Sequence, residues 1–380
     1  MRNFRQEFSD FSPTIYLDCA YQGPLPRVAV ERLQRGIELK MRPDRLEAPE
    51  YFQLPWRVRA RIAHLVGADP GEIALTTSAT QGVGIVATGL PLGAGDEVVV
   101  ASSNFPSNLF TWLHLRRKGV AVKVIQPVGT DVELDEVEEA LTERTRVLAL
   151  DWVSYTSGYR IDLAALGNLV HARGGIFVVD GTQAAGALEV NLGALPVDVL
   201  ACGAYKWLLG PYGTGFAYLR RDLRAKLDLP VVNWYSVEGA EDFDALPRTD
   251  FKLADDARVF DCGETGNFIN LYGFDASLEF LEQVTPRAVQ EHCRRLLERL
   301  ARGLRDSGFT LSAASEPGHE STILGFRAAT LEATTRLHRR LRAHHIAVSL
   351  RQDLIRVSPH LYNDETDIDQ LLEVARLEGD

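Results

Sequence analysis

The sequence has few cysteines and no long apolar segment, and both shortages exclude classes of protein. Its four cysteines, among 380 residues, are Cys19, Cys202, Cys262 and Cys293, and none of them forms a Cys-x-x-Cys pair. This spacing removes the usual zinc and dithiol signatures, so we expect reduced thiols and no metal site. No apolar run approaches the roughly 18 residues that a membrane helix needs, so we expect no membrane partner.

Positive charge is also scarce. The 41 Lys and Arg residues against 52 Asp and Glu residues give a formal net charge of −11. A chain of this charge is not expected to bind nucleic acid, whose phosphates attract basic surfaces. The first residues, MRNFRQEFSDF, are charged from the second position and lack the apolar core of a signal peptide, so we expect a cytoplasmic protein.

Short apolar runs alternate with amphipathic stretches from about residue 73 to residue 232. The runs in DEVVVAS, TRVLALDWVS, IFVVDGTQ and VDVLACGAYK are continuous, as expected of strands that are buried on both faces. Amphipathic stretches such as LAALGNLVHARGG separate these runs and predict helices. The pattern predicts an α/β fold with a mostly parallel sheet flanked by helices.

The pattern of apolar and polar residues changes from about residue 277. We expect one long amphipathic helix through ASLEFLEQV and HCRRLLERLARGLRDSG, then short strands near STILGFR and IAVSL, and a closing helix in DETDIDQLLEVARLEG. These elements predict a smaller α+β domain. We assign residues 16–260 to the large domain and residues 1–15 and 261–380 to the small one, with an irregular connection over 233–258.

Polar residues follow three of the apolar runs, where ligands collect in open α/β sheets. Asp180 ends IFVVD, Lys206 follows VLACG, and Ser78 follows IALTT at the start of an expected helix. The free amides at such a helix start can bind a phosphate. Each feature alone has an ordinary explanation, as a helix cap, a surface lysine or a simple helix start.

Together the three features match what pyridoxal 5′-phosphate needs. A lysine forms the Schiff base, an acid keeps the pyridine nitrogen protonated, and a helix terminus holds the phosphate. Lys206 is therefore the candidate catalytic residue, and pyridoxal 5′-phosphate is the expected cofactor.

With these features the chain resembles the class V aminotransferase group of fold-type I pyridoxal-phosphate enzymes. This group includes cysteine desulfurases, kynureninases, C–S lyases and isopenicillin N epimerase-like proteins. The resemblance covers nearly the whole chain and runs through YLDCAYQGPLP, TTSATQGVGIVA, SSNFPSNLFTW, VVDGTQAAG, GAYKW, FDCGETGN and LIRVSPHLYND. It implies a fold-type I architecture, an α-amino-acid substrate and a homodimer whose active sites lie at the subunit interface.

The resemblance also implies a role for individual residues. Arg356 would hold the substrate carboxylate, with Tyr21 and Cys19 as further substrate-binding residues. Thr265 would bind the phosphate of the neighbouring subunit. The cofactor-binding residues within one subunit would be Ala79 and Thr80 at the phosphate, Phe105 stacked on the ring, Asp180 at the pyridine nitrogen, Gln183 at the 3′ oxygen, Tyr205 donating to the phosphate and Lys206 in the Schiff base.

One departure from the group bears on the reaction. Cysteine desulfurases need a cysteine shortly before the arginine segment to receive sulfur, and HHIAVSLRQDLIRVSP has none. We therefore expect a lyase of the C–S or kynureninase-like kind, because GAYKW, NFPSN and IRVSPHLYN favour it. Transamination and epimerisation stay open, as does a non-catalytic binding protein on the same fold. Arg351, just before Arg356, is either a second substrate contact or a loop charge.

Overall fold

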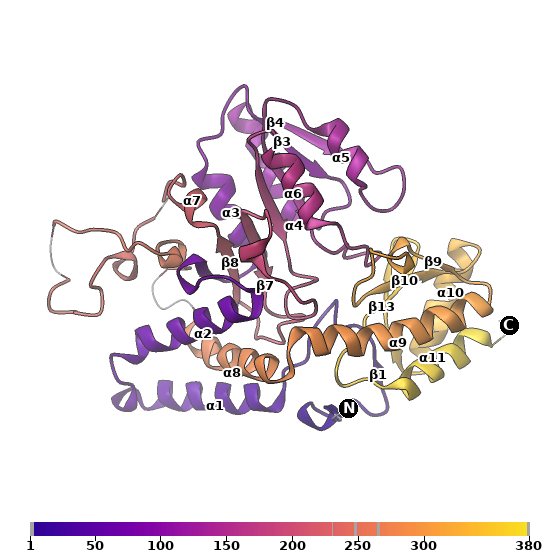
Figure 1. Cartoon of the computed structure of the whole chain (residues 1–380). Coiled ribbons are helices and arrows are strands. Elements are labelled where there is room, and N and C mark those ends of the chain that lie inside the picture. The colour runs from indigo at the N-terminus through magenta and orange to yellow at the C-terminus, as the bar shows by residue number, and fades with distance from the viewer. Residues whose placement is uncertain (1–3, 230, 247–248, 264–266, 378–380) are drawn as a thin grey trace.

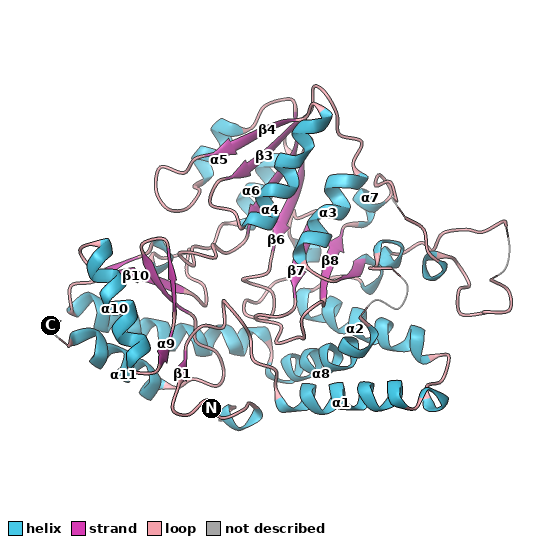
Figure 2. Ribbon diagram, turned by 180° about the vertical axis from the view of Figure 1, so that it is seen from behind, coloured by secondary structure: helices cyan, strands magenta, loops and turns pink. Residues whose placement is uncertain are grey.

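The computed structural model describes residues 4–229, 231–246, 249–263 and 267–377. A central seven-stranded sheet is flanked by helices, and a smaller four-stranded sheet lies beside it with the C-terminal helices (Figure 1). The same two groups of elements are seen from behind in Figure 2. The arrangement confirms the α/β class that the alternating apolar and amphipathic runs predict.

The large sheet is mostly parallel. Its spatial order is β2-β8-β7-β6-β5-β3-β4, and of these seven described strands β8 alone runs against its neighbours. The carboxyl ends of β2, β3, β5, β6 and β7 therefore meet at one edge. The strands are β2 Ile73–Thr76, β3 Glu97–Ala101, β4 Ala121–Ile125, β5 Thr145–Asp151, β6 Ile176–Asp180, β7 Val199–Gly203 and β8 Gly215–Leu219.

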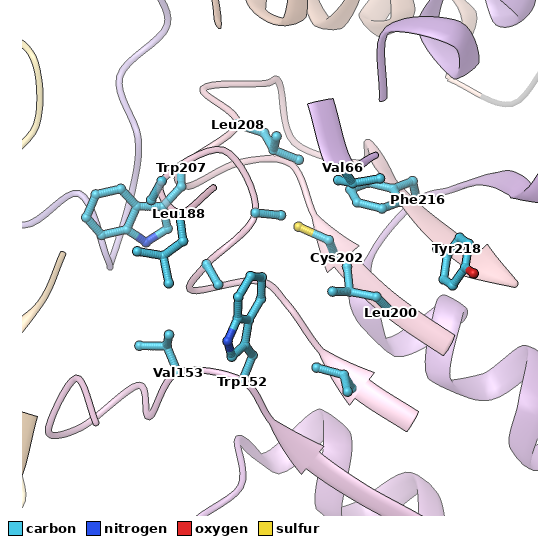
Figure 3. Packing of buried hydrophobic residues seen from close by; sticks show 14 of the residues in the cluster. Val66, Trp152, Val153, Leu188, Leu200, Cys202, Trp207, Leu208, Phe216 and Tyr218 are labelled. Carbon is cyan, nitrogen blue, oxygen red and sulfur yellow. The ribbon is translucent and has the colours of Figure 1, made fainter. Parts of the chain in front are cut away.

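Both faces of this sheet are covered, which explains its continuous apolar strands. In β3, Val98 and Val100 pack in one hydrophobic cluster while Val99 and Ala101 pack in another, because successive side chains point to opposite faces. Figure 3 shows part of the larger cluster, with Cys202 among its buried members. The helices of this part are α1 Arg27–Met41, α2 Glu50–Val66, α3 Ala79–Gly89, α4 Pro106–Leu113, α5 Leu134–Ala140, α6 Leu163–His171, α7 Arg221–Arg224 and α8 Phe268–Val284.

The small sheet has its own hydrophobic cluster, to which α9, α10 and α11 contribute. Its antiparallel order is β12-β13-β10-β9. A separate parallel pair, β1 with β11, joins the N-terminal segment to this part of the chain. The elements are β1 Ile15–Tyr16, α9 Pro286–Asp306, β9 Thr310–Leu311, β10 Leu324–Arg327, α10 Leu331–Ala343, β11 Ile346–Ala347, β12 Ser349–Arg351, β13 Leu354–Val357 and α11 Glu365–Arg376.

The single long helix expected from residue 277 is wrong, because the structure has two helices there. Helix α8 ends at Val284 and α9 begins at Pro286. Thr285 between them has φ 73°, and its side chain caps α9 by accepting a hydrogen bond from the backbone of Ala288. Proline has no N–H to continue a helix and fits its first position, so it starts α9.

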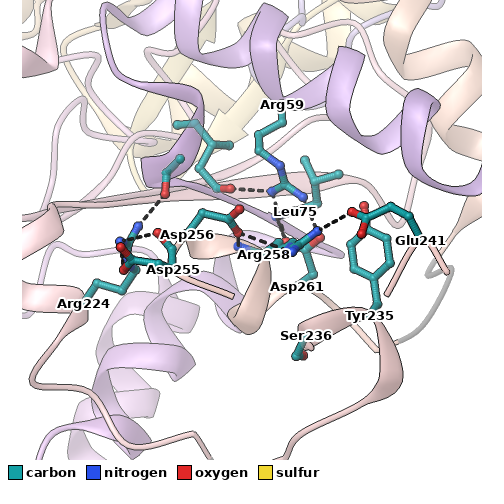
Figure 4. A network of polar contacts seen from close by, with 12 residues as sticks. Arg59, Leu75, Arg224, Tyr235, Ser236, Glu241, Asp255, Asp256, Arg258 and Asp261 are labelled. Atoms are coloured by element: carbon teal, nitrogen blue, oxygen red, sulfur yellow. Dashed lines mark hydrogen bonds and ion pairs between the residues drawn. The ribbon is translucent and has the colours of Figure 1, made fainter. Parts of the chain in front are cut away.

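Among its described residues, the expected irregular connection over 233–258 contains the short 3-10 helix Trp234–Ser236 and the start of another, Ala257–Phe260. Asp261, which follows this second 3-10 helix, forms an ion pair of 2.9 Å with the fully buried Arg59 (Figure 4). Asp261 also accepts a hydrogen bond of 2.8 Å from the backbone of Leu75. These contacts place Asp261 beside β2.

The proposed division into two domains stays a prediction. Helix α8, which follows residue 261, packs against α1 and α2. The N-terminal strand β1 pairs with β11 in the C-terminal part. Separately, no helix in the described ranges is long and apolar enough to cross a membrane.

Candidate active site

A pocket lies at the edge of the large sheet where the parallel strands end. It brings together seven residues singled out from the sequence as cofactor contacts, although they come from four separate segments. The lining residues are Ser78, Ala79, Thr80, Phe105, Ser107, Asp151, Val153, Tyr155, Asp180, Thr182, Gln183, Gly203, Tyr205 and Lys206.

Lys206 is a buried lysine, with 6% of its surface exposed. Burial, aided by the charge of Arg356, lowers the pKa of its amine to about 8, although the carboxyls of Asp180 and Asp151 oppose the shift. Its Nζ lies 5.3 Å from the centre of the Phe105 ring. An amine with its pKa near neutrality, enclosed beside a ligand pocket, is suited to covalent attachment and to proton transfer.

Glycine at position 23 allows the backbone around Lys206 to be held tightly. A Cβ there would lie 1.8 Å from the carbonyl oxygen of Lys206, so no other residue fits without displacing that loop. The backbone N–H of Gly23 donates to the carbonyl of Tyr205 at 2.9 Å. After Lys206, Gly213 has φ 72°, a left-handed backbone conformation that glycine adopts without steric cost.

The start of α3 forms one end of the pocket. Ser78 caps this helix, as predicted, by accepting a hydrogen bond of 3.2 Å from the backbone of Gln81. Ala79 and Thr80 therefore present the unpaired amides of a helix N-terminus to the pocket. Gly203 also lines the pocket, where a Cβ would lie 3.8 Å from the backbone nitrogen of Ala79. This end of the pocket suits a phosphate group.

Two carboxyls lie side by side at the ends of β5 and β6, where Asp151 pairs with Asp180 in the register. Burial raises the pKa of both groups, that of Asp151 to about 8. Asp180 accepts a hydrogen bond of 2.9 Å from the backbone of Thr182. Asp151 accepts bonds from the backbone of Phe105 at 2.6 Å and from the side chain of Asn108 at 3.0 Å. Asp151 thus fixes the turn that carries Phe105.

Neighbouring residues also hold the side chains of Gln183 and Tyr205 in place. The amide of Gln183 donates to the carbonyl of Ala20 at 3.0 Å and accepts from the indole of Trp207 at 3.0 Å. The Tyr205 ring stacks on Tyr212, with their centres 5.7 Å apart. Because both ends of the Gln183 amide are used, its orientation in the pocket is fixed.

His360 supports this region from behind Trp207. The two rings are 5.6 Å apart, and His360 is fully buried. Neither ring nitrogen has a hydrogen-bond partner among the described residues. Burial therefore lowers the pKa of His360 to about 3.

This histidine makes stability depend on pH in a known direction. The folded protein keeps His360 neutral down to about pH 3, whereas the unfolded chain takes up the proton near pH 6.5, so acid favours unfolding. Between pH 7 and pH 5 we expect this residue to cost about 2 kcal/mol of unfolding free energy, and His360→Phe to lose that dependence. Urea unfolding at pH 7 and pH 5 measures it, with the exposed His344→Phe as control. The prediction would be contradicted if wild type and His360→Phe lost the same free energy of unfolding between pH 7 and pH 5.

The residues expected at the substrate lie beside the pocket and are not among those that line it. Arg356 is 1% exposed, and its guanidinium pairs with Asp18 at 3.0 Å and donates to the carbonyl of Tyr155 at 2.5 Å. Tyr21 is exposed. Cys19 is completely buried, and burial raises the pKa of its thiol, so the structure gives this thiol no access to a ligand. Thr265 lies outside the described residues, and the homodimer stays a prediction.

Two residues of this region, Asp151 and Asp18, were missed from the sequence. Asp151 follows the apolar run VLAL as Asp180 follows IFVV, so the same signal was present. Asp18 carries no such signal, because its role depends on Arg356, which is distant in the sequence.

The chain is similar to known proteins over nearly its whole length. The family model for aminotransferase class-V matches residues 46–371. The chain is 30% identical to isopenicillin N epimerase of Amycolatopsis lactamdurans, over 98% of this chain and 97% of that protein. It is 28% identical to a probable cysteine desulfurase of Methanothermobacter thermautotrophicus, over 94% and 93% of the two chains.

A solved structure of the cystine C–S lyase C-DES, in complex with its reaction product cysteine persulfide, has a similar fold. Its TM-score is 0.87 at 23% identity, covering 97% of this chain and 99% of that one. The likeness confirms the predicted fold-type I architecture.

Proposed function

The chain belongs to the class-V aminotransferase family, whose cofactor is pyridoxal 5′-phosphate, and we propose that it is a lyase that expels a substituent from the β-carbon of an α-amino acid. The observation that carries the proposal is the buried amine of Lys206, with its pKa lowered to about 8, in a pocket that also holds a phosphate-binding helix end and a buried acid. The match to this family confirms the resemblance found in the sequence, and with it the expected cofactor.

The residues present fit this cofactor. The amides of Ala79 and Thr80 would hold its phosphate, and Asp180 would face its pyridine nitrogen. Phe105 and Gln183 would contact its ring and its 3′ oxygen, while Tyr205 would add a hydroxyl near the phosphate. When bound, the cofactor supplies a sink for the electron pair left at the α-carbon. The carboxyl of Asp180 is buried and its pKa is raised, so a protonated ring nitrogen beside it would stabilise the ionised form.

Lys206 would carry out the proton transfers. Its amine takes the proton from the α-carbon, and the electron pair released there expels the β-substituent as its carbon bond breaks. Arg356 would hold the α-carboxylate, because a guanidinium presents a fork of donors that matches a carboxylate. Persulfide chemistry on a loop cysteine is not proposed, because residues 344–356 contain no cysteine.

Epimerisation is the second candidate. It is favoured by the 30% identity to isopenicillin N epimerase over nearly the whole chain. An epimerase returns a proton to the α-carbon without breaking any other bond. Tyr155, whose ring lies 5.2 Å from that of Phe105, is a hydroxyl-bearing residue on the Phe105 side of the pocket.

One experiment separates the two reactions. The holoenzyme is incubated in D₂O with β-substituted amino acids such as cystine, cysteine and β-chloroalanine, and the products are followed by NMR. Lyase activity gives pyruvate, ammonia and the freed substituent in equal amounts. Deuterium at the α-carbon with inversion and without keto acid would instead support the epimerase and overturn the lyase.

A further inference from the structure

A second arginine lies on the face of the small sheet that carries Arg356. In the β12–β13 hairpin, Ser349 is opposite Arg356, and Arg351 is two residues beyond Ser349. Because alternate residues of a strand share a face, Ser349, Arg351 and Arg356 lie together on one side. The hydroxyl of Ser349 confirms which side this is, since it donates to Asp18 at 2.5 Å.

The two arginines differ in how they are neutralised. Arg356 is buried and paired with Asp18. Arg351 is half-buried, and within the described ranges of the chain no carboxylate pairs with it. Its guanidinium donates a long hydrogen bond of 3.5 Å to the carbonyl of Leu350, and its guanidinium carbon lies 5.9 Å from the centre of the Tyr21 ring. The nearby turn residue Asp353 pairs with Arg327 instead.

The turn that carries Tyr21 connects Arg351 to the active site. The backbone of Tyr21 donates to the carbonyl of Asp18, and the hydroxyl of Tyr16 donates to the carbonyl of Gln22 at 2.8 Å. Gly23, two residues after Tyr21, is bonded to the backbone of Tyr205 beside Lys206. Arg351 therefore lies at the outer edge of the site, beyond the Asp18–Arg356 pair.

We propose that Arg351 binds a second anionic group of the substrate, and that the substrate is an α-amino acid whose side chain ends in a carboxylate. The inference rests on the proposed function, since it takes Arg356 and Lys206 as the groups that hold the α-amino acid. A half-buried guanidinium with one face on an aromatic ring keeps its fork of donors free for a carboxylate. A neutral side chain of the same length would leave this charge unpaired.

The test measures binding without turnover. Amino acids with a methyl group on the α-carbon have no α-proton to lose, so the probes are 2-methylaspartate, 2-methylglutamate and 2-methyl-2-aminoadipate, each with its side-chain amide. Dissociation constants for the holoenzyme are measured by calorimetry and by the change in the visible absorbance of the cofactor. The variants are Arg351→Gln and Arg351→Lys, with Arg327→Gln as a matched loss of one arginine beside the same hairpin.

We expect the wild type to bind at least one acid about 10-fold to 100-fold more tightly than its amide, because a charged hydrogen bond contributes more than a neutral one. Arg351→Gln should abolish this preference while binding of the amide stays within about twofold of wild type. Arg351→Lys should keep part of it, and Arg327→Gln should keep all of it.

Two results would overturn the inference while leaving the proposed function intact. One is equal binding of acids and amides by the wild type, and the other is an unchanged preference in Arg351→Gln. A holoenzyme whose absorbance responds to none of the probes, nor to alanine or cysteine, would instead contradict the proposed function, and the inference with it.

Discussion

Lys206→Ala is expected to abolish covalent attachment of the cofactor and to lower kcat by at least about 10³-fold, because it removes both the nucleophile and the proton carrier. The visible absorbance band that depends on the covalent bond between lysine and cofactor should disappear. Lys206→Arg should fail equally, since a guanidinium keeps its proton and cannot form that bond. The exposed Lys226→Ala should behave as wild type.

The stability of a Lys206 variant distinguishes a catalytic lysine from one that only supports the fold. In the cofactor-free protein the buried amine of Lys206 costs stability below about pH 10.5, where the unfolded chain takes up the proton, and the cost is complete below about pH 8, where the folded protein takes it up as well. The difference of about 2.5 pKa units corresponds to about 3 kcal/mol at pH 7. Lys206→Met should therefore unfold at higher urea concentration than the cofactor-free wild type. A lysine that stabilised the fold would give the opposite shift, and full activity of Lys206→Ala would refute its catalytic role.

Much of the fold could be predicted because its main signals are local. Strand β6 ends at Asp180 and α3 begins after Ser78, as the apolar runs and the capping residue predict. The break between α8 and α9 was missed although Pro286 marks it, because the apolar pattern continues on both sides of the break. The reversed direction of β8 depends on how distant strands pair, which no local pattern contains.

The candidate site divides in the same way. Residues that follow strands of the parallel sheet, such as Asp180, could be placed together because the carboxyl ends of such strands meet at one edge. Asp151 obeys the same rule and could have been found. The pairing of Asp18 with Arg356 joins two ends of the chain, 338 residues apart, and nothing in either segment indicates it. The burial of Cys19 likewise follows from packing rather than from its motif.

Breaking the Asp18–Arg356 ion pair is expected to lower both the stability of the protein and its binding of α-amino acids. Arg356→Ala should lower the unfolding free energy by about 3–5 kcal/mol, because it leaves the carboxyl of Asp18 buried without its cation. Burial already raises the pKa of Asp18 despite that cation. The same variant should lose binding of α-amino acids, since it removes the group that would hold their α-carboxylate. Urea unfolding and the absorbance titration measure the two effects separately.

The double variant Asp18→Asn/Arg356→Gln distinguishes the structural role of Arg356 from its role in binding. Two neutral amides can hydrogen-bond to each other without a buried charge, so the double variant should recover most of the stability that Arg356→Ala loses. Binding of α-amino acids should not recover, because an amide lacks the charge that pairs with a carboxylate. If the double variant bound amino acids as tightly as the wild type, Arg356 would serve the fold alone, and the α-carboxylate would need another partner in the site.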